Sequence, residues 1–384
     1  MGDREQSSIG NTTRIASKNI SMSAAELNET DIEAVIEVLR SGRLALGPKV
    51  EEFEQQMAAY IGVKHAVAVS SGTAALHLMV RSLGIRPGDE VLVPSFTFAA
   101  SVNAILYEGA TPVFVDINPL TYTIDANDLA GKIGRRTKAI MAVDVFGHPV
   151  EWDEISEIAR ERHLPVIDDS CEALGAEFRG QRVGQFGNAA AFAFYPNKQI
   201  TTGEGGIIVT NDDAIAGSSR CLRNQGRTEM GEWLEHEHLG YNYRMDEMSA
   251  ALGISQLLRI DKLLQKRERV AQIYTEWLKN NERLAVPLCQ PYARVSWFVY
   301  VVTLAEGVDR KRIMRLMANH DIPVRCYFSP IHLQPYIRRL FGFRGGELPV
   351  TESVSQRTLA LPFHGGLLPQ EIERVVGVLT DAVT

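Results

Sequence analysis

The segment from Ala189 to Gly206 reads AAAFAFYPNKQITTGEGG, an apolar run followed by a single lysine and a glycine-rich loop. The apolar run from Ala189 to Tyr195 predicts a buried strand, and Gly206 to Thr210 predicts the next one. Lys198 therefore stands between a buried strand and a flexible turn. A solvated loop lysine is the ordinary interpretation. If the amine is buried instead, desolvation favours its neutral form, which can form a Schiff base with an aldehyde.

Five more short apolar runs precede this segment and alternate with helical patterns. Helices are predicted at Glu26 to Arg40, Val50 to Tyr60 and Thr73 to Ser82. Alternation of this kind favours parallel strands joined by crossover helices, so the sequence predicts an α/β fold with a mainly parallel, seven-stranded sheet covered by helices. The five earlier strands are predicted at His65 to Ser70, Glu90 to Pro94, Pro112 to Ile117, Thr137 to Val145 and Pro165 to Asp168.

The length of 384 residues fits two domains better than one. Residues 1–22 are polar and predict a flexible tail, and residues 23–260 predict the large domain. A helical pattern from Asp246 to Asn280 is long for a globular helix, and we place the domain boundary within it. Residues 261–384, with a strand at Trp297 to Leu304 and a helix at Asp309 to His320, predict a smaller α+β domain.

Composition excludes several classes of protein. The formal net charge of -7 and the absence of a basic face argue against a nucleic-acid binder. No apolar run approaches the roughly 20 residues that a membrane helix needs. The four cysteines show no CxxC pairing, so we predict no disulfide framework and no metal site, and a cytoplasmic location.

Polar residues that follow predicted strands deserve inspection, because open α/β sheets bind ligands beyond the carboxyl ends of their strands. Ser70-Ser71-Gly72-Thr73-Ala74-Ala75 opens a helix and is either a phosphate cradle or an ordinary N-cap. Phe98 is either a stacking platform or core. The adjacent carboxylates of Asp168 and Asp169 end an apolar run, which implies a buried cationic partner unless one of them caps a turn.

A phosphate cradle, a stacking aromatic ring, a carboxylate and a lysine at one crevice are what pyridoxal 5'-phosphate (PLP) requires of a protein. A nicotinamide-dependent dehydrogenase would also be doubly wound, but GxGxxG is absent after the first strand. A P-loop is excluded because GxxxxGK[ST] is absent as well.

At these residues the sequence resembles the DegT/DnrJ/StrS family of PLP-dependent sugar aminotransferases, which have the fold type I of aspartate aminotransferase. The resemblance extends from about residue 24 to the end of the chain. The motifs that carry it, in family order, are Ser71 to Leu76, Val93 to Phe98, Asp168 to Gly175, Lys198 with Thr202 to Gly206, and Gly240 to Met245.

The resemblance implies a role for each residue of these motifs. Lys198 would hold PLP as a Schiff base and act as general base, and Asp169 would pair with the pyridine nitrogen. Arg244 would hold the carboxylate of L-glutamate or form a structural salt bridge, and His332 is a candidate substrate contact. The remaining cofactor contacts would be Gly72, Thr73 and Ala74 at the phosphate, Phe98 on the ring, Glu172 near the ring hydroxyl, and Asn242 at the phosphate of a neighbouring subunit's cofactor.

Three departures from the family pattern limit these implications. Ala193 replaces a frequent Ser, Glu172 stands where Gln or His is frequent, and Asn188 replaces a common Asp. Relatives that dehydrate sugars carry His in place of Lys198, so transamination is the better hypothesis.

The resemblance thus implies a homodimer with shared active sites that moves an amino group from L-glutamate to a nucleotide-linked keto sugar, most simply a 4-keto-6-deoxy hexose. A 3-keto sugar or a keto-cyclitol is an alternative substrate. A non-catalytic regulator or binding protein with the same fold is the alternative of a different class.

Overall fold

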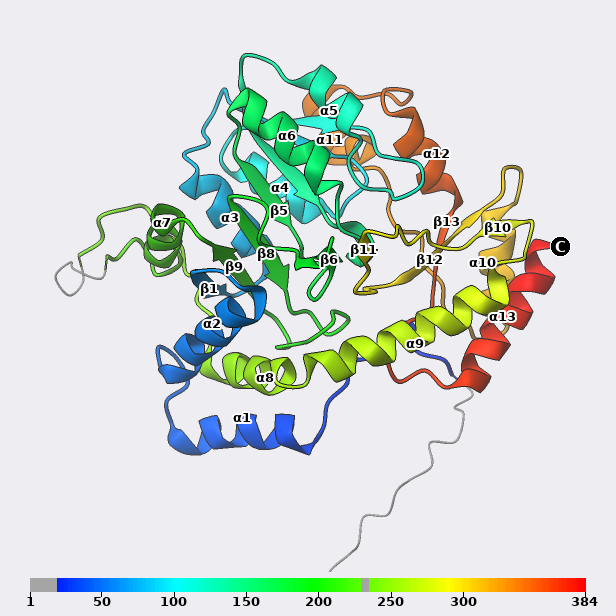
Figure 1. Ribbon diagram of the computed structural model, residues 1–384, viewed down its shortest axis with the longest axis horizontal. Coiled ribbons are helices and arrows are strands. Elements are labelled where there is room, and N and C mark those ends of the chain that lie inside the picture. Colours follow the sequence, from blue (N-terminus) through cyan, green and yellow to red (C-terminus); the bar gives the residue numbers. More distant parts are fainter. Residues whose placement is uncertain (1–18, 229–234) are drawn as a thin grey trace, which may run out of the picture.

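The computed structural model describes residues 19–228 and 235–384. Its centre is a seven-stranded sheet that contains all seven strands expected from the sequence (Figure 1). Strand β9 runs antiparallel to both of its neighbours, and the other pairs are parallel. In spatial order the strands are β1 (His65–Val69), β9 (Gly206–Thr210), β8 (Ala189–Ala193), β5 (Val166–Asp169), β4 (Thr137–Val143), β2 (Glu90–Pro94) and β3 (Thr111–Val115).

Helices cover both faces of this sheet, as its nearly continuous apolar strands require. One face packs against α3 (Gly72–Ser82), α4 (Ala99–Tyr107) and α7 (Asp213–Arg223). The other face packs against α2 (Pro48–Ile61), α5 (Ala126–Lys132), α6 (Trp152–Arg162) and α8 (Glu247–Leu257). Helix α1 (Glu29–Ser41) begins at a capping box on Asn28 and packs against α8.

The long helical pattern after Asp246 is two helices rather than one. Helix α8 ends at Leu257, and α9 runs over Ile260–Leu278. Arg259 leaves the helical conformation, and its guanidinium bonds Asp31 and the Glu26 carbonyl of the N-terminal segment. These tertiary contacts therefore end the first helix at a point where the apolar periodicity of the sequence continues. We propose that the two domains meet at this break, at residues 260 and 261.

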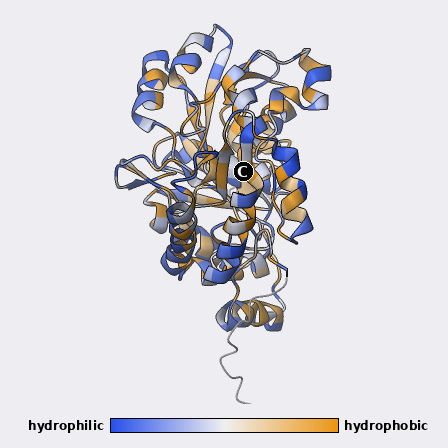
Figure 2. Cartoon of the chain, turned by 90° about the vertical axis from the view of Figure 1, so that its right-hand side faces the viewer, coloured by the Kyte–Doolittle hydropathy of each residue, from blue (hydrophilic) through white to orange (hydrophobic). Residues whose placement is uncertain are grey.

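The C-terminal part has a core of its own, formed by α9, the small sheet and the last helix. That sheet contains β10 (Leu284–Ala285), β12 (Tyr300–Leu304) and β13 (Thr358–Leu361). Figure 2 shows hydrophobic and hydrophilic residues interleaved along the helices of this end. The helices that follow α9 in the sequence are α10 (Arg310–Asn319), α11 (Pro335–Phe341), α12 (Pro349–Arg357) and α13 (Pro369–Val383).

Two details differ from the expected boundaries. Ile20 lies within the segment expected to be a flexible tail, but it is buried in the C-terminal core, and the Met22 carbonyl accepts a hydrogen bond from Phe363 N. The expected strand at Trp297 to Leu304 begins only at Tyr300, because Trp297 has a positive φ of 53°. A second small sheet joins β6 (Glu177–Phe178), β7 (Gln181–Arg182) and β11 (Ala293–Arg294).

Within residues 19–228 and 235–384, every helix is too short or too polar to cross a membrane. All four cysteines have free thiols.

Candidate active site

A cavity of about 330 Å³ lies at the carboxyl ends of the parallel strands, between the sheet and a segment of the C-terminal part. Residues from motifs far apart in the sequence line it, as expected for an open α/β sheet. Of the residues singled out from the sequence, it brings together Gly72, Thr73, Phe98, Asp169, Glu172 and Lys198.

Lys198 follows β8 and is largely buried, with 12% of its side chain exposed. Its Nζ lies 3.6 Å from Oε1 of Glu172 and 3.8 Å from the centre of the Phe298 ring. The Lys198 carbonyl accepts a hydrogen bond of 2.6 Å from Arg267. The solvated-loop interpretation of this lysine is therefore wrong, because the C-terminal part covers the loop.

Glu172 is as buried as Lys198, and its position is fixed. Its Oε2 accepts a hydrogen bond of 2.9 Å from Phe146 N, and its own carbonyl accepts one of 2.6 Å from Gln199. Burial raises the pKa of Glu172, and the nearby positive charge of Lys198 opposes that rise.

Asp169, at the end of β5, is only 6% exposed and faces the cavity. Its Oδ2 accepts a hydrogen bond of 2.6 Å from the Ser101 hydroxyl, and its Oδ1 accepts one of 3.2 Å from Cys171 N. No ion pair with Asp169 occurs in residues 19–228 and 235–384. The cationic partner expected from the sequence is thus not a side chain of the described part of this chain, and the cavity side of Asp169 has room for a cationic ligand.

Asp168 points to the other face of the sheet and is fully buried. Its partners are the Ser170 hydroxyl at 2.8 Å and Gly184 N at 3.2 Å, and the same hydroxyl lies 2.7 Å from Asp144. Burial, and then the charge of Asp144, raise the pKa of Asp168 well above its usual value. Its partners are neutral donors, no cation pairs with it within residues 19–228 and 235–384, and the raised pKa favours its protonated form.

The turn after β1 forms the N-cap that was one of the two alternatives left open by the sequence, and the phosphate cradle stays a prediction. Ser71 caps α3, with its hydroxyl accepting a hydrogen bond of 3.1 Å from Ala74 N. Gly72 and Thr73 line the cavity. Ala74, expected as a phosphate contact, is buried behind the cavity, and its N–H is directed to Ser71.

The backbone around this turn is packed too closely for side chains. A Cβ on Gly72 would lie 2.7 Å from Cβ of Ala193, and one on Gly206 would lie 2.4 Å from the backbone of Ser71. Ala193, the position of the missing family Ser, also lines the cavity. These contacts leave a cradle of backbone groups at the amino end of α3, which is suited to a phosphate.

Phe98 precedes α4 and lines the cavity, yet 63% of its surface is exposed. It is therefore not a core residue in this chain. A ring of this kind at the mouth of a cavity is available for stacking on a flat ligand.

Asn242 and Arg244 lie away from this cavity. Asn242 is exposed, and Arg244 lines a separate cavity and donates a hydrogen bond of 3.0 Å to Asn224. No salt bridge to Arg244 occurs in residues 19–228 and 235–384. These two residues do not reach the Lys198 cavity of their own chain.

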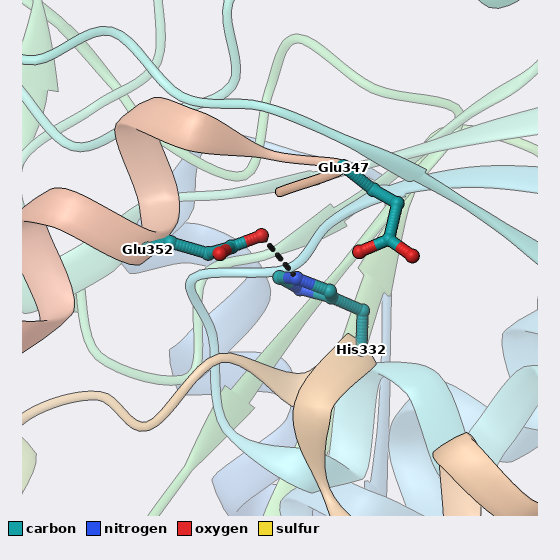
Figure 3. Close-up of side chains that lie close together, drawn as sticks. All are labelled: His332, Glu347 and Glu352. Carbon is teal, nitrogen blue, oxygen red and sulfur yellow. Dashed lines mark hydrogen bonds and ion pairs between the residues drawn. The ribbon is translucent and has the colours of Figure 1, made fainter. Parts of the chain in front are cut away.

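His332 is fully buried and does not line the cavity. Its ring nitrogens contact the Ser95 hydroxyl at 2.6 Å and Oε1 of Glu352 at 3.1 Å. Figure 3 shows Glu347 beside this pair. One ring nitrogen of His332 and one carboxylate oxygen from each of the two glutamates lie within 4.8 Å of one another. Glu347 accepts hydrogen bonds from the backbone of its own turn, at Arg344 N and Gly345 N. The arrangement holds the segment that covers the cavity and gives His332 no free nitrogen for a substrate.

Several residues of the site have no signal in the sequence. Arg267 is buried and donates to the carbonyls of Asn197, Lys198, Trp297 and Phe298, but it sits in a charged run that resembles a solvated helix face. Phe298 and Tyr327 cover the cavity from the C-terminal part.

Asn188, which replaces the Asp common in the family, accepts a hydrogen bond of 2.8 Å from Val166 N and so joins two strands.

Comparison with known proteins agrees with this geometry. Residues 25–380 match the model of the DegT/DnrJ/EryC1/StrS aminotransferase family. The chain belongs to this family. It is 40% identical to GDP-perosamine synthase of Caulobacter vibrioides, over 95% of this chain and 98% of that one.

Two further similarities extend the comparison. The chain is 35% identical to the dTDP-3-amino-3,4,6-trideoxy-alpha-D-glucose transaminase of Streptomyces venezuelae, over 98% of each chain. The structure of a putative sugar aminotransferase from Streptococcus pneumoniae in its PLP form matches with a TM-score of 0.90 and 27% identity, covering 95% of this chain and 98% of that one. The protein is accordingly a PLP-dependent aminotransferase with an α/β fold.

The cavity of this aminotransferase fits PLP. The cradle at Gly72 and Gly206 can take a phosphate, Phe98 can stack on a ring, and Asp169 lacks a cation on its cavity side. Lys198 has a buried amine in the same cavity. These residues would hold the cofactor.

Proposed function

We propose that this aminotransferase moves an amino group from L-glutamate to a nucleotide-linked keto sugar, most simply a 4-keto-6-deoxy hexose. The observation that supports it is the convergence of Lys198, Asp169 and the Gly72 turn on one cavity. The similarity to a GDP-perosamine synthase supports a nucleotide-linked sugar as substrate.

PLP, when bound, supplies an aldehyde that takes up the amino group and a ring that accepts electrons. We assign to Lys198 the covalent attachment and the movement of the proton at the reacting carbon, because among residues 19–228 and 235–384 its amine alone combines burial with reach into the cavity. Asp169 would keep the pyridine nitrogen protonated, and Ser101 orients its carboxylate.

We further propose that the enzyme is a cytoplasmic homodimer with shared active sites. Asn242 and Arg244 are the residues that support sharing, since neither lines the Lys198 cavity of its own chain. Asn242 would contact the phosphate in the partner's cavity, and Arg244 would bind the carboxylate of glutamate there.

A 3-keto sugar is the second candidate substrate, and the similarity to a transaminase named for a 3-amino sugar favours it. A keto-cyclitol would use the same cavity chemistry. A non-catalytic regulator would not need a buried lysine beside an acidic residue, so the geometry favours the enzyme.

The first test is the visible absorption spectrum of the purified protein with PLP, before and after addition of L-glutamate. We expect a band that requires Lys198 and that glutamate bleaches. Lys198→Ala should abolish the band, whereas Lys262→Ala, at an exposed lysine of α9, should keep it. A band that forms normally in Lys198→Ala, or that glutamate leaves unchanged, contradicts the proposal. Screening of keto sugars then separates the candidate substrates.

A further inference from the structure

The amine of Lys198 has one carboxylate partner in residues 19–228 and 235–384, and that partner is Glu172. The two side chains are only 12% and 11% exposed. Their N–O distance of 3.6 Å is that of an ion pair rather than of a close hydrogen bond. A small rotation of either side chain would bring them into hydrogen-bonding contact.

Both members of the pair are anchored on the side away from the cavity. Phe146 N holds the far oxygen of Glu172, and Gln199 joins the Glu172 carbonyl to the Ser296 hydroxyl. Arg267 holds the backbone of Lys198. The far oxygen of Glu172 and the backbone of both residues are therefore held, whereas the Lys198 side chain can rotate and one carboxylate oxygen is free to face the amine.

Two charge states of such a pair are close in energy when it is buried. Burial of an ammonium and a carboxylate costs desolvation energy, which the neutral pair of amine and carboxylic acid does not. The Phe298 ring, 3.8 Å from Nζ, favours the cationic amine and opposes this tendency. Burial raises the pKa of Glu172, which favours the neutral pair of amine and carboxylic acid.

Other titratable groups face the pair, but none replaces Glu172. Both oxygens of Asp169 are directed to Ser101 and Cys171 N. Burial raises the pKa of the Cys171 thiol, and burial, then the charge of Glu172, raise that of the Tyr327 hydroxyl, so both stay protonated near neutrality. Glu204 lines the same cavity but is exposed and forms no ion pair with Lys198.

We propose that Glu172 is the proton partner of Lys198. When the amine must be neutral to attack an aldehyde or to accept a proton from the substrate carbon, an N–H bond of the ammonium breaks and an O–H bond forms on Glu172. The proton returns from Glu172 to the amine once Lys198 has passed on the proton that it took from the substrate carbon and its nitrogen is neutral again. No oxidant or reductant is involved. The proposal rests on the proposed function for its catalytic meaning, but the proton exchange belongs to this chain alone.

Glu172 stands at a position where the family resemblance leads us to expect Gln or His. A Gln side chain always offers an N–H donor, whereas Glu172 donates only after it has taken the proton. Glu172 can therefore donate a hydrogen bond into the cavity only while the Lys198 amine is neutral.

The first experiment needs no cofactor. In Lys198→Met, Glu172 loses its cation, and we expect the infrared difference spectrum against the wild-type protein near neutral pH to show the C=O band of a newly protonated carboxylic acid, because the contribution of Asp144 and Asp168 is common to both proteins and cancels. The band should be absent from Lys198→Met/Glu172→Gln and present in Lys198→Met/Glu204→Gln. A band that persists without Glu172, or no band in Lys198→Met, overturns the proposal. Circular dichroism of each variant identifies any that fails to fold.

The second experiment uses the PLP-loaded protein and its visible band. Because a carboxylate stabilises a nearby cation, Glu172→Gln should lower the midpoint of the band's pH titration by about one unit, a tenfold change in proton affinity. Glu204→Gln should leave the midpoint in place. Formate should restore the wild-type midpoint in Glu172→Ala, where it has space, but not in Glu172→Gln.

The outcomes separate the two proposals. If wild-type protein forms no band with PLP, the proposed function fails, while the infrared result still decides the proton exchange. If the band forms and its titration is the same in Glu172→Gln, only the proton exchange fails.

Discussion

Asp169 shows how the structure prepares one carboxylate for a cationic ligand. Neutral donors, a hydroxyl and a backbone N–H, bind its two oxygens, so the residue stays oriented without its charge being cancelled. Thr97 contacts the Ser101 hydroxyl at 2.8 Å and extends this arrangement. The charge is thereby left for the group that occupies the cavity.

We predict that Asp169→Asn lowers kcat by about 100-fold or more, because a preorganised charge is lost from a buried site. The measurement is a steady-state assay with the keto sugar identified by screening. Thr97→Ser, which keeps the hydroxyl that contacts Ser101, serves as control and should retain most of the activity. Near-normal turnover of Asp169→Asn would rule out the role assigned to Asp169.

The second prediction concerns the buried acids Asp144 and Asp168. One Ser170 hydroxyl contacts both, and a single O–H can donate to only one of them, so the other must carry a proton. Burial raises the pKa of Asp144 to about 6. The pKa of Asp168 is raised as well, so the folded state binds more protons than the unfolded chain from about pH 4 upward, through Asp144 to about pH 6 and through Asp168 beyond it. The free energy of unfolding should therefore fall as pH rises through this range.

Asp168→Asn should flatten this dependence, since the amide donates to Ser170 without needing a proton. We expect it to raise the free energy of unfolding above pH 6 by about 1–3 kcal/mol. Urea denaturation between pH 4 and 8 measures it, with Asp381→Asn, at an exposed carboxylate of α13, as control. An unchanged pH profile in Asp168→Asn would show that the two acids do not share a proton.

At the scale of elements, the start of β9 packs directly against the start of α3. A Cβ at Gly206 would lie 2.4 Å from the Ser71 carbonyl carbon and oxygen, which are backbone atoms that cannot move aside by a rotamer change. The phosphate cradle thus depends on a glycine in a neighbouring strand, not only on those in its own turn.

We therefore predict that Gly206→Ala weakens PLP binding at least about tenfold and lowers stability by about 1–3 kcal/mol, through the displaced α3 terminus. Gly377→Ala is a matched control, because a Cβ there meets nothing within 4 Å and the residue lies in helix α13. That variant should gain up to about 1 kcal/mol. Fluorescence titration with PLP and thermal unfolding distinguish the two. Equal behaviour of both variants would contradict the close packing.

Elements were predictable from the sequence to different degrees. The seven strands follow from apolar runs bounded by turns, because buried parallel strands need continuous apolar sequence. The break at Arg259 was not predictable, because its cause is a contact with Asp31, more than two hundred residues away. Arg267 was missed for the same reason, since its four carbonyl partners come from two distant segments.

At the scale of the whole molecule, Asn242 and Arg244 are motif residues that do not line the Lys198 cavity of their own chain. Both belong to an extended segment beside β1, where the Tyr243 carbonyl accepts a hydrogen bond of 2.8 Å from Ser70 N. Tyr241 and Tyr243 stack at 4.9 Å and pack on the buried His77, so the residue between them is directed outward.

This arrangement predicts complementation between inactive variants. Lys198→Ala and Asn242→Ala should each be nearly inactive as pure proteins. After unfolding and refolding together, about one quarter of wild-type activity should return, because half of the dimers are mixed and each of these has one intact site. Sedimentation tests whether the proposed dimers form. If mixing restores no activity, Asn242 does not act across subunits.

The sequence by itself determined the order and type of the main elements, the lysine and carboxylate of the site, and the family, because these depend on local apolar patterns and on short motifs. The tertiary structure alone decided that Lys198 is buried against Glu172, that Asp168 contacts the same hydroxyl as Asp144 while Asp169 faces the cavity, and that His332 is buried between Ser95 and Glu352 instead of lining the site. The physical reason is that burial and charge pairing depend on residues distant in sequence, which a local pattern cannot contain.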